Sequence, residues 1–231
     1  MSQQRVGMQF GDWFRAAGKR SLVVFGDSIT VGVGATVPER SWAGLVAAEL
    51  AVRELRNAGI SGSTLQSSPM ADGLPRPGNG FSRYGAALIE ARADAIVILY
   101  GYNDARYTAA PDAFNVEAFS RQYHEMVAAL LEAGYVPGDI CVGSPPFIPT
   151  MGLDHGSTGF TGQSRAGFEE YVHAVEALAC EFRCFYAPVY ERMAAHRDGT
   201  LASPDITHPN DLGHEVIARS VLEATVGVSP D

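Results

Sequence analysis

The feature that most constrains the fold of this chain is the alternation of short apolar runs with amphipathic segments. Apolar runs rich in branched side chains occur at 21–25 (SLVVF), 95–100 (AIVILY) and 139–144 (DICVGS), with weaker strand patterns at 52–57 and 184–188. Such runs are typical of parallel strands that are covered on both faces. Between them, apolar residues recur at helical spacing, in the segments 42–50, 81–91, 116–130, 168–182 and 212–221. This repetition predicts an α/β fold, a three-layer α/β/α sandwich with a mostly parallel five-stranded sheet and right-handed crossovers.

The length and composition favour one domain. The chain has 231 residues, of which 46% are hydrophobic and 19% charged, as in an ordinary globular protein with a large core. Because no internal repeat and no linker-like boundary appears, we expect residues 21–231 to form a single domain, with residues 1–20 as an N-terminal extension packed on it. The Pro/Gly-rich stretches 67–80 and 144–163 are predicted as long loops, and long loops in compact domains are often functional.

The net charge and the lack of long apolar segments limit the classes of partner and the location that we expect. A net charge of −9 would repel phosphate backbones and anionic lipid, so we expect a neutral small molecule as the partner, and neither nucleic acid nor a membrane. The N-terminus lacks the apolar core of a signal peptide, and no run approaches the length of a membrane span, which predicts a cytoplasmic protein.

The chain has three cysteines. Cys141, Cys180 and Cys184 are odd in number and show no CxxC spacing, so we expect buried free thiols and no metal or other cofactor. The oligomeric state is left open.

Polar residues follow the predicted strands at the points where ligands bind in open sheets. The sequences GDS, NAGISG, GYND and SPDITHPN come after the first, second, third and last strand, and the carboxyl ends of parallel strands meet at one edge. Taken singly, these residues have ordinary interpretations as turn, loop and helix-cap residues. Together they supply a hydroxyl nucleophile, an Asp-x-x-His pair and hydrogen-bond donors, which are the parts that acyl transfer needs.

The four blocks FGDSIT, NAGISG, YGYND and DITHPN, in this order, resemble the motifs of the SGNH (GDSL-type) hydrolase superfamily. The resemblance implies a flavodoxin-like sandwich and a serine esterase with Ser28 as nucleophile, His208 as general base and Asp205 as the residue that orients the base. It also implies an oxyanion hole made by the backbone amides of Ser28 and Gly62 and the side chain of Asn103.

The resemblance leaves the substrate open, because this superfamily includes esterases, lipases, thioesterases and carbohydrate deacetylases. A carbohydrate O-deacetylase, a thioesterase or a lysophospholipase therefore stand as alternatives. Many relatives have an acid shortly after the glycine of the second block, where this chain has Ser63. The role of the N-terminal residues 1–20 is also open.

The remaining polar and aromatic residues divide into three groups. We expect Asp27 and Asp104 to be structural hydrogen-bonding acids. We expect His124 and His173 to lie on partly exposed helix faces, and His196 and His214 to be surface or last-helix residues, all four without a catalytic role. His155 is open because its loop faces the mouth of the site. Aromatic residues that follow strand ends are candidates to line a substrate pocket: Tyr102, Tyr107, Phe147 and Phe160.

Two other classes of protein could use the same residues. A phosphate-binding module could use the glycine-rich GDSITVGVGA, but the chain lacks both G-x-G-x-x-G and the Gly-Lys-Ser/Thr ending of a P-loop. A catalytically silent binding domain on the same fold is the other alternative. Hydrolysis of an activated acetate ester separates it from the enzyme.

Overall fold

A six-stranded sheet forms the centre of the computed structural model, which describes residues 7–67, 78–105, 115–153 and 164–227. The strand order is β2-β1-β3-β4-β5-β6. The parallel strands are β1 (Ser21–Gly26), β2 (Glu54–Gly59), β3 (Ala95–Leu99), β4 (Ile140–Gly143) and β5 (Phe185–Ala187). The mostly parallel sheet is thus confirmed, but the predicted number of five strands is corrected to six. The additional β6 (Thr225–Val226) pairs antiparallel with β5, and two residues are too few to show a periodicity in the sequence.

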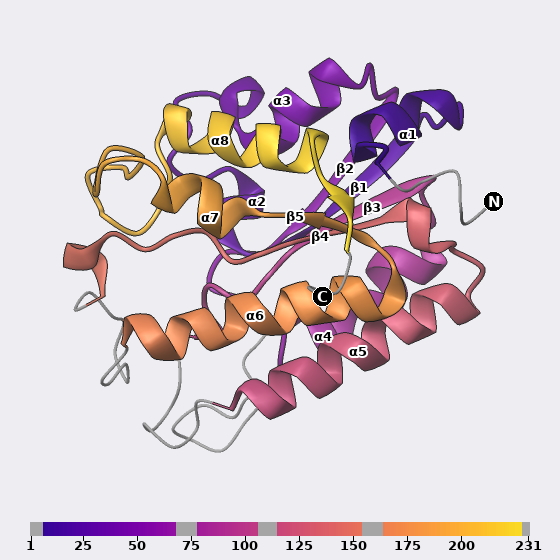
Figure 1. The fold of residues 1–231 in the computed structure, drawn as a ribbon. Coiled ribbons are helices and arrows are strands. Elements are labelled where there is room, and N and C mark those ends of the chain that lie inside the picture. The colour runs from indigo at the N-terminus through magenta and orange to yellow at the C-terminus, as the bar shows by residue number, and fades with distance from the viewer. Residues whose placement is uncertain (1–6, 68–77, 106–114, 154–163, 228–231) are drawn as a thin grey trace.

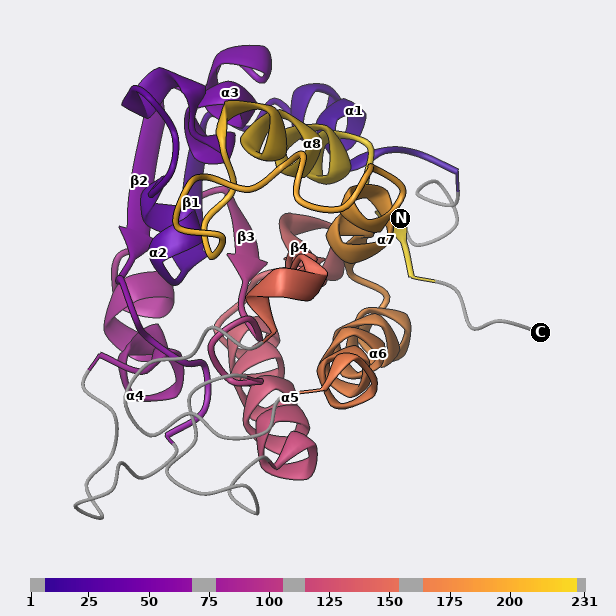
Figure 2. The same cartoon turned by 90° about the vertical axis from the view of Figure 1, so that its left-hand side faces the viewer.

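Helices cover both faces of the sheet (Figures 1 and 2). On one face lie α1 (Phe10–Ala16), α3 (Trp42–Glu49) and α8 (Asp211–Leu222), and on the other α4 (Gly80–Tyr84), α5 (Val116–Glu132) and α6 (Arg165–Phe182). A π-helical segment (Gly85–Glu90) extends α4, and α7 (Val189–Ala194) follows β5. The short elements are α2 (Ser28–Val31) and 3-10 turns at Pro38–Arg40, Pro137–Asp139 and Thr150–Gly152. The chain therefore has the expected three-layer α/β/α architecture.

Burial explains why some strands are easier to predict than others. Every residue of β3 and β4 is buried, and so are the last five residues of β1, so these central strands appear in the sequence as unbroken apolar runs. Strand β2 is at the edge of the sheet and none of its residues is buried, which accounts for its weak pattern and for the shift of its bounds from 52–57 to 54–59.

The N-terminal helix α1 contributes to the core. Its Phe10 and Phe14 side chains are fully buried, and the Phe10 ring packs edge-on against Phe185 of β5 at 5.5 Å between centroids. The Phe10 N–H donates to the carbonyl of Ala224, which precedes β6.

None of the three cysteines forms a disulfide, and the predicted burial holds for two of them. Cys141 and Cys184 are buried, whereas Cys180, on α6, is only partly buried. Among the residues that the structure describes, none of the helices combines the length and the apolar character that a membrane span requires.

Candidate active site

Ser28 lies at the point where β1 turns into the short helix α2. Asp27 is the N-cap of this helix, and its Oδ1 atom accepts a 2.9 Å hydrogen bond from the N–H of Ile29. A side chain at Gly26 would lie 2.4 Å from the carbonyl oxygen of Leu99 in β3, so glycine is required for this tight turn. Ser28 is the first helical residue and is 9% exposed. The turn therefore places the Ser28 hydroxyl at the carboxyl end of β1.

His208 and Asp205 form the second part of the site. Asp205 Oδ1 accepts hydrogen bonds from the backbone N–H groups of Thr207 (3.0 Å) and His208 (2.9 Å), which closes a tight turn. Asp205 Oδ2 lies 2.6 Å from Nδ1 of the His208 ring, and Nε2 of that ring lies 2.9 Å from Ser28 Oγ. Because a carboxylate only accepts, Nδ1 carries the proton and Nε2 is left to accept the hydrogen of the Ser28 hydroxyl.

The pKa of the Asp205 carboxyl suits a group that lies next to an imidazole ring. Its side chain is about half exposed, at 49%. Although partial burial acts to raise the pKa of this carboxyl, hydrogen bonds from the backbone and the ring of His208 and from the N–H of Thr207 outweigh it, so the pKa is lowered. Asp205 is therefore ionised at neutral pH and can stabilise a protonated His208 ring.

Asn103 and Gly62 lie on the loops that follow β3 and β2. The buried Asn103 amide donates to the carbonyl of Ser63 at 2.9 Å and lies 3.4 Å from Asp27 Oδ2. Gly62 adopts the left-handed conformation, with φ of 75°. The first N–H groups of a helix have no intrahelical acceptor, and Ser28 opens α2. The three residues of the predicted oxyanion hole thus lie after β1, β2 and β3, and the side-chain amide of Asn103 is directed at Ser63 and Asp27 in this structure.

Asp27 and Asp104 are buried acids beneath these loops. Asp104 accepts 2.9 Å hydrogen bonds from the N–H groups of Leu65 and Gln66, and so ties the loop after β2 to the loop after β3. Burial raises the pKa of Asp27 to about 7, with a further rise from the neighbouring Asp104 carboxyl, and burial raises the pKa of Asp104 to about 6. Their hydrogen bonds agree with the structural role that we predict for both.

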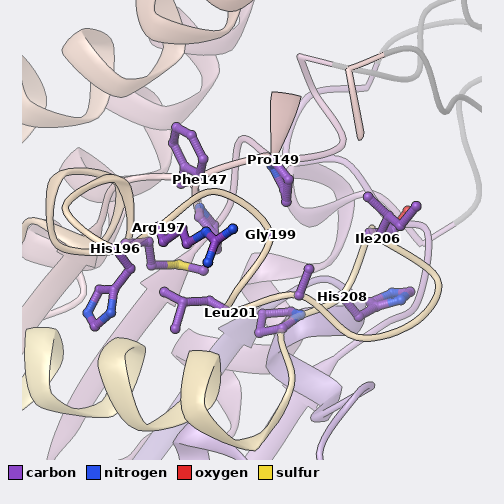
Figure 3. Close-up of a pocket in the computed structure, with 13 residues that line it drawn as sticks. Phe147, Pro149, His196, Arg197, Gly199, Leu201, Ile206 and His208 are labelled. Atoms are coloured by element: carbon purple, nitrogen blue, oxygen red, sulfur yellow. The ribbon is translucent and has the colours of Figure 1, made fainter. Parts of the chain in front are cut away.

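Two of the aromatic candidates are described by the structure. Phe147 lines a pocket beside His208, together with Pro149, Leu201 and Ile206 (Figure 3). Tyr102 is buried, and its hydroxyl donates to the carbonyl of Thr207 at 2.8 Å. Tyr107, Phe160 and His155 lie outside the described residues.

Of the histidines outside the site that the structure describes, three are exposed and one is buried. His124, His173 and His196 are exposed, whereas His214, which lies in the last helix α8 and not at the surface, is fully buried. Nδ1 of His214 accepts from the N–H of Trp42 at 3.3 Å, and Nε2 donates to the carbonyl of Val33 at 3.2 Å. The reason is that α8 packs against α3, which encloses this ring. Burial lowers the pKa of His214.

Sequence reasoning missed two residues that build the site. The Arg83 guanidinium donates to the carbonyls of Gly26 and Ala58 at 3.0 and 2.6 Å, and to the Tyr100 hydroxyl at 2.6 Å. It thereby joins the ends of β1, β2 and β3.

The second residue is Gly34. It has φ of 96°, and a side chain there would lie 2.0 Å from the carbonyl oxygen of Pro209. The glycine-rich VGVGA after Ser28 was the available signal for Gly34, whereas a single arginine in a helix carries none.

The residues described do not gather into a metal centre. Within 7–67, 78–105, 115–153 and 164–227, there is no group of three or more His, Cys, Asp or Glu side chains that could hold a metal ion.

The fold and the site define a class: α/β proteins in which a Ser–His–Asp hydrogen-bonded chain lies at the carboxyl edge of a parallel sheet. Residues 24–216 match the GDSL-like Lipase/Acylhydrolase family, and the chain therefore belongs to this family of hydrolases. The comparison with curated proteins gives no match.

Solved structures share the SGNH hydrolase fold. The lipase/acylhydrolase from Enterococcus faecalis superposes with a TM-score of 0.65 at 20% identity, covering 88% of this chain and 93% of that one. Axe2, an acetylxylan esterase from Geobacillus stearothermophilus, has a TM-score of 0.64 at 20% identity and covers 88% and 92%. The acetyl xylan esterase AlAXEase has a TM-score of 0.63 at 20% identity, with 87% and 96% covered.

Proposed function

We propose that this protein is a serine esterase that hydrolyses carboxylic ester bonds through an acyl-enzyme on Ser28. The observation that carries the proposal is the continuous hydrogen-bonded chain from Ser28 Oγ through His208 to Asp205, with distances of 2.9 and 2.6 Å. The family match supports hydrolase chemistry. A small-molecule ester as substrate and a cytoplasmic location belong to the same proposal.

The geometry suggests how each step would proceed. Ser28 Oγ attacks the ester carbonyl carbon while its proton passes to Nε2 of His208, and the oxyanion is bound by the donors of Ser28, Gly62 and Asn103. When the tetrahedral intermediate collapses, the bond to the alcohol oxygen breaks and the imidazolium gives this proton to the leaving alkoxide. Water then attacks the acyl group, again with His208 as base, and the acid leaves as Ser28 recovers its proton.

A carbohydrate O-deacetylase is the second candidate. The structures of two acetylxylan esterases resemble this chain, although at 20% identity the likeness establishes the fold and not the substrate. A panel of acyl esters from acetate to palmitate, run beside an acetylated sugar, an acyl thioester and a lysophospholipid, distinguishes this candidate from a thioesterase or lysophospholipase.

The test of the proposal is a double-mutant experiment on an activated acetate ester. Because Ser28 and His208 would act in one step, Ser28→Ala and His208→Ala should each lower kcat by about 1,000-fold or more, and the double variant should be about as active as the worse single variant. A serine-directed phosphonate should label Ser28 in the parent and only slowly in His208→Ala. The exposed His173→Ala serves as the matched control and should keep full activity.

Two results would contradict this assignment. Additive losses in the double variant would show that the two residues do not share a step. Folded parent protein that neither hydrolyses any ester of the panel nor reacts with the phosphonate would favour the silent binding domain.

A further inference from the structure

Tyr102 occupies a short segment that also carries a predicted oxyanion donor. It follows Gly101 in the loop after β3, which ends at Leu99, and directly precedes Asn103. Gly101 has φ of 113°, and a side chain there would lie 2.6 Å from Cγ of Pro145, so glycine lets this segment approach the loop after β4 closely. The N–H of Ala105 donates to the carbonyl of Gly101 at 3.0 Å, which closes the turn.

The Tyr102 side chain is held in one position. It is only 3% exposed, and its ring packs edge-on against Phe168 of α6, with centroids 6.1 Å apart and an angle of 81° between the planes. Phe168 is itself fully buried. The ring is therefore fixed by packing, and the hydroxyl at its end has a defined position.

The hydroxyl of Tyr102 reaches the peptide unit that precedes His208. It donates to the carbonyl oxygen of Thr207 at 2.8 Å, across 105 positions of sequence. The N–H of the same peptide unit, which belongs to His208, donates to Asp205 Oδ1 at 2.9 Å. Because a peptide unit is planar and rigid, the two bonds fix it from opposite sides, and with it the Cα atom from which the imidazole projects.

The turn that these bonds hold is a strained one. Ile206, between Asp205 and Thr207, has φ of 61°, a left-handed conformation that is costly for a β-branched residue. Strain of this kind persists only where the surroundings enforce it. The N–H of Ile206 donates to Ser203 and that of Thr207 to Asp205, both within the turn, whereas the bond from Tyr102 connects the turn to the end of β3.

We infer that Tyr102 is a positioning residue for the general base: through the Thr207 carbonyl it keeps Nε2 of His208 within hydrogen-bond distance of Ser28 Oγ. Since Tyr102 adjoins Asn103, one short segment sets the base and an oxyanion donor relative to each other. The inference rests on the proposed function of Ser28 and His208. It assigns to Tyr102 a role in orientation in place of contact with the substrate.

The variant Tyr102→Phe tests this inference, because it keeps the ring and its contact with Phe168 and removes only the hydroxyl. We expect kcat for an activated ester to fall by about tenfold while KM changes by less than about twofold, and the rate of phosphonylation of Ser28 to fall in parallel. The NMR signal of the Nδ1 proton of His208, which lies in the 2.6 Å contact with Asp205, should broaden or shift.

Tyr135→Phe is the matched control. The Tyr135 hydroxyl also donates to a backbone carbonyl at 2.8 Å, that of Leu88, and the side chain is 3% exposed as well. Its loss should lower the melting temperature as much as Tyr102→Phe does, or more, and leave kcat and the His208 signal unchanged.

Several outcomes would overturn the inference. A Tyr102→Phe variant with the kcat of the Tyr135→Phe control would show that the hydroxyl does not position the base, and a rise in KM at unchanged kcat would make Tyr102 a substrate contact. If the parent protein has no esterase activity, the proposed function fails instead. In that case the NMR signal of the Nδ1 proton of His208 still tests whether Tyr102 positions the ring. An unchanged signal in Tyr102→Phe would reject the inference.

Discussion

At the scale of single residues, Asp27 is a carboxyl whose ionisation changes strongly on folding. It is 1% exposed, it caps α2 through Ile29, and its second oxygen lies 3.4 Å from the Asn103 amide. Burial raises its pKa from 3.8 to about 7. A carboxyl with a raised pKa binds more protons in the folded than in the unfolded state, so its contribution to stability is fully present below its unfolded pKa and is lost as pH rises toward its folded pKa.

We therefore predict that Asp27→Asn flattens the pH dependence of stability. Between about pH 4 and about pH 8, the free energy of unfolding of the parent should fall relative to that of the variant by roughly 2 kcal/mol or more, since each pKa unit corresponds to about 1.4 kcal/mol. Urea denaturation over a pH series measures this difference, with the exposed Asp12→Asn as control. A difference that stays constant with pH would mean that Asp27 is not protonated in the folded protein.

At the scale of elements, the segment that follows α2 determines how closely two parts of the chain approach each other. These are helix α2, which begins at Ser28, and the loop before α8, which carries His208. Gly34 lies under the His208 loop, where a side chain would be 2.0 Å from the Pro209 carbonyl oxygen and 3.1 Å from Cβ of His208. Nearby, the N–H and the hydroxyl of Thr36 both donate at 2.8 Å to Asp211 at the start of α8. Backbone packing therefore joins two parts of the chain that are far apart in sequence.

Gly34→Ala should displace the His208 loop. We expect kcat to fall by about 100-fold or more, as reacting groups displaced by about 1 Å lose this much, and stability to fall by about 2 kcal/mol or more. The matched control is Gly18→Ala, which also has a positive φ, of 66°, but has nothing within 4 Å of the added side chain. In this control only backbone strain should lower the free energy of unfolding, by about 1 kcal/mol, and kcat should stay unchanged. Equal losses of kcat in the two variants would reject the argument.

At the scale of the whole molecule, one core extends from the N-terminal helix to the last strand. Phe14 of α1 is fully buried and packs at 6.3 Å from Phe10, whose N–H donates to the carbonyl of Ala224. Helix α1 leads into the N-terminal end of β1, whereas Ser28 follows the carboxyl end of that strand. Stability and catalysis should therefore be separable in this protein.

Phe14→Ala tests this separation. The cavity that it leaves should lower the free energy of unfolding by about 3–5 kcal/mol, while kcat measured at a temperature where the variant is folded should change by less than about twofold. Val136→Ala, at a position that is 50% exposed, is the control and should change stability by about 0.5 kcal/mol or less. A large loss of kcat in folded Phe14→Ala would show that α1 influences the site.

The sequence alone determined the class of fold and the polar residues that gather at the carboxyl edge of the sheet. Strands β1, β3 and β4 are buried on both faces, and burial on both faces leaves an unbroken apolar run that a reader of the sequence can find. GDS begins at the last residue of β1, GYND follows β3, NAGISG begins in β2, and DITHPN lies between α7 and α8. The first three motifs were visible because residues at the carboxyl ends of parallel strands meet at one edge of the sheet. The exposed edge strand β2 and the two-residue β6 left weaker signals, because their burial imposes little pattern.

Only the tertiary structure decided which polar atoms meet. Ser28 and His208 are 180 positions apart, and their 2.9 Å contact depends on the strand order and on the close approach at Gly34. The bond from Tyr102 to the Thr207 carbonyl, the reach of Arg83 and the burial of His214 are likewise invisible in local patterns. The physical reason is that hydrophobic periodicity records which face of an element is buried, whereas a hydrogen bond requires two particular atoms within about 3 Å of each other, and the packing of distant elements alone sets that distance.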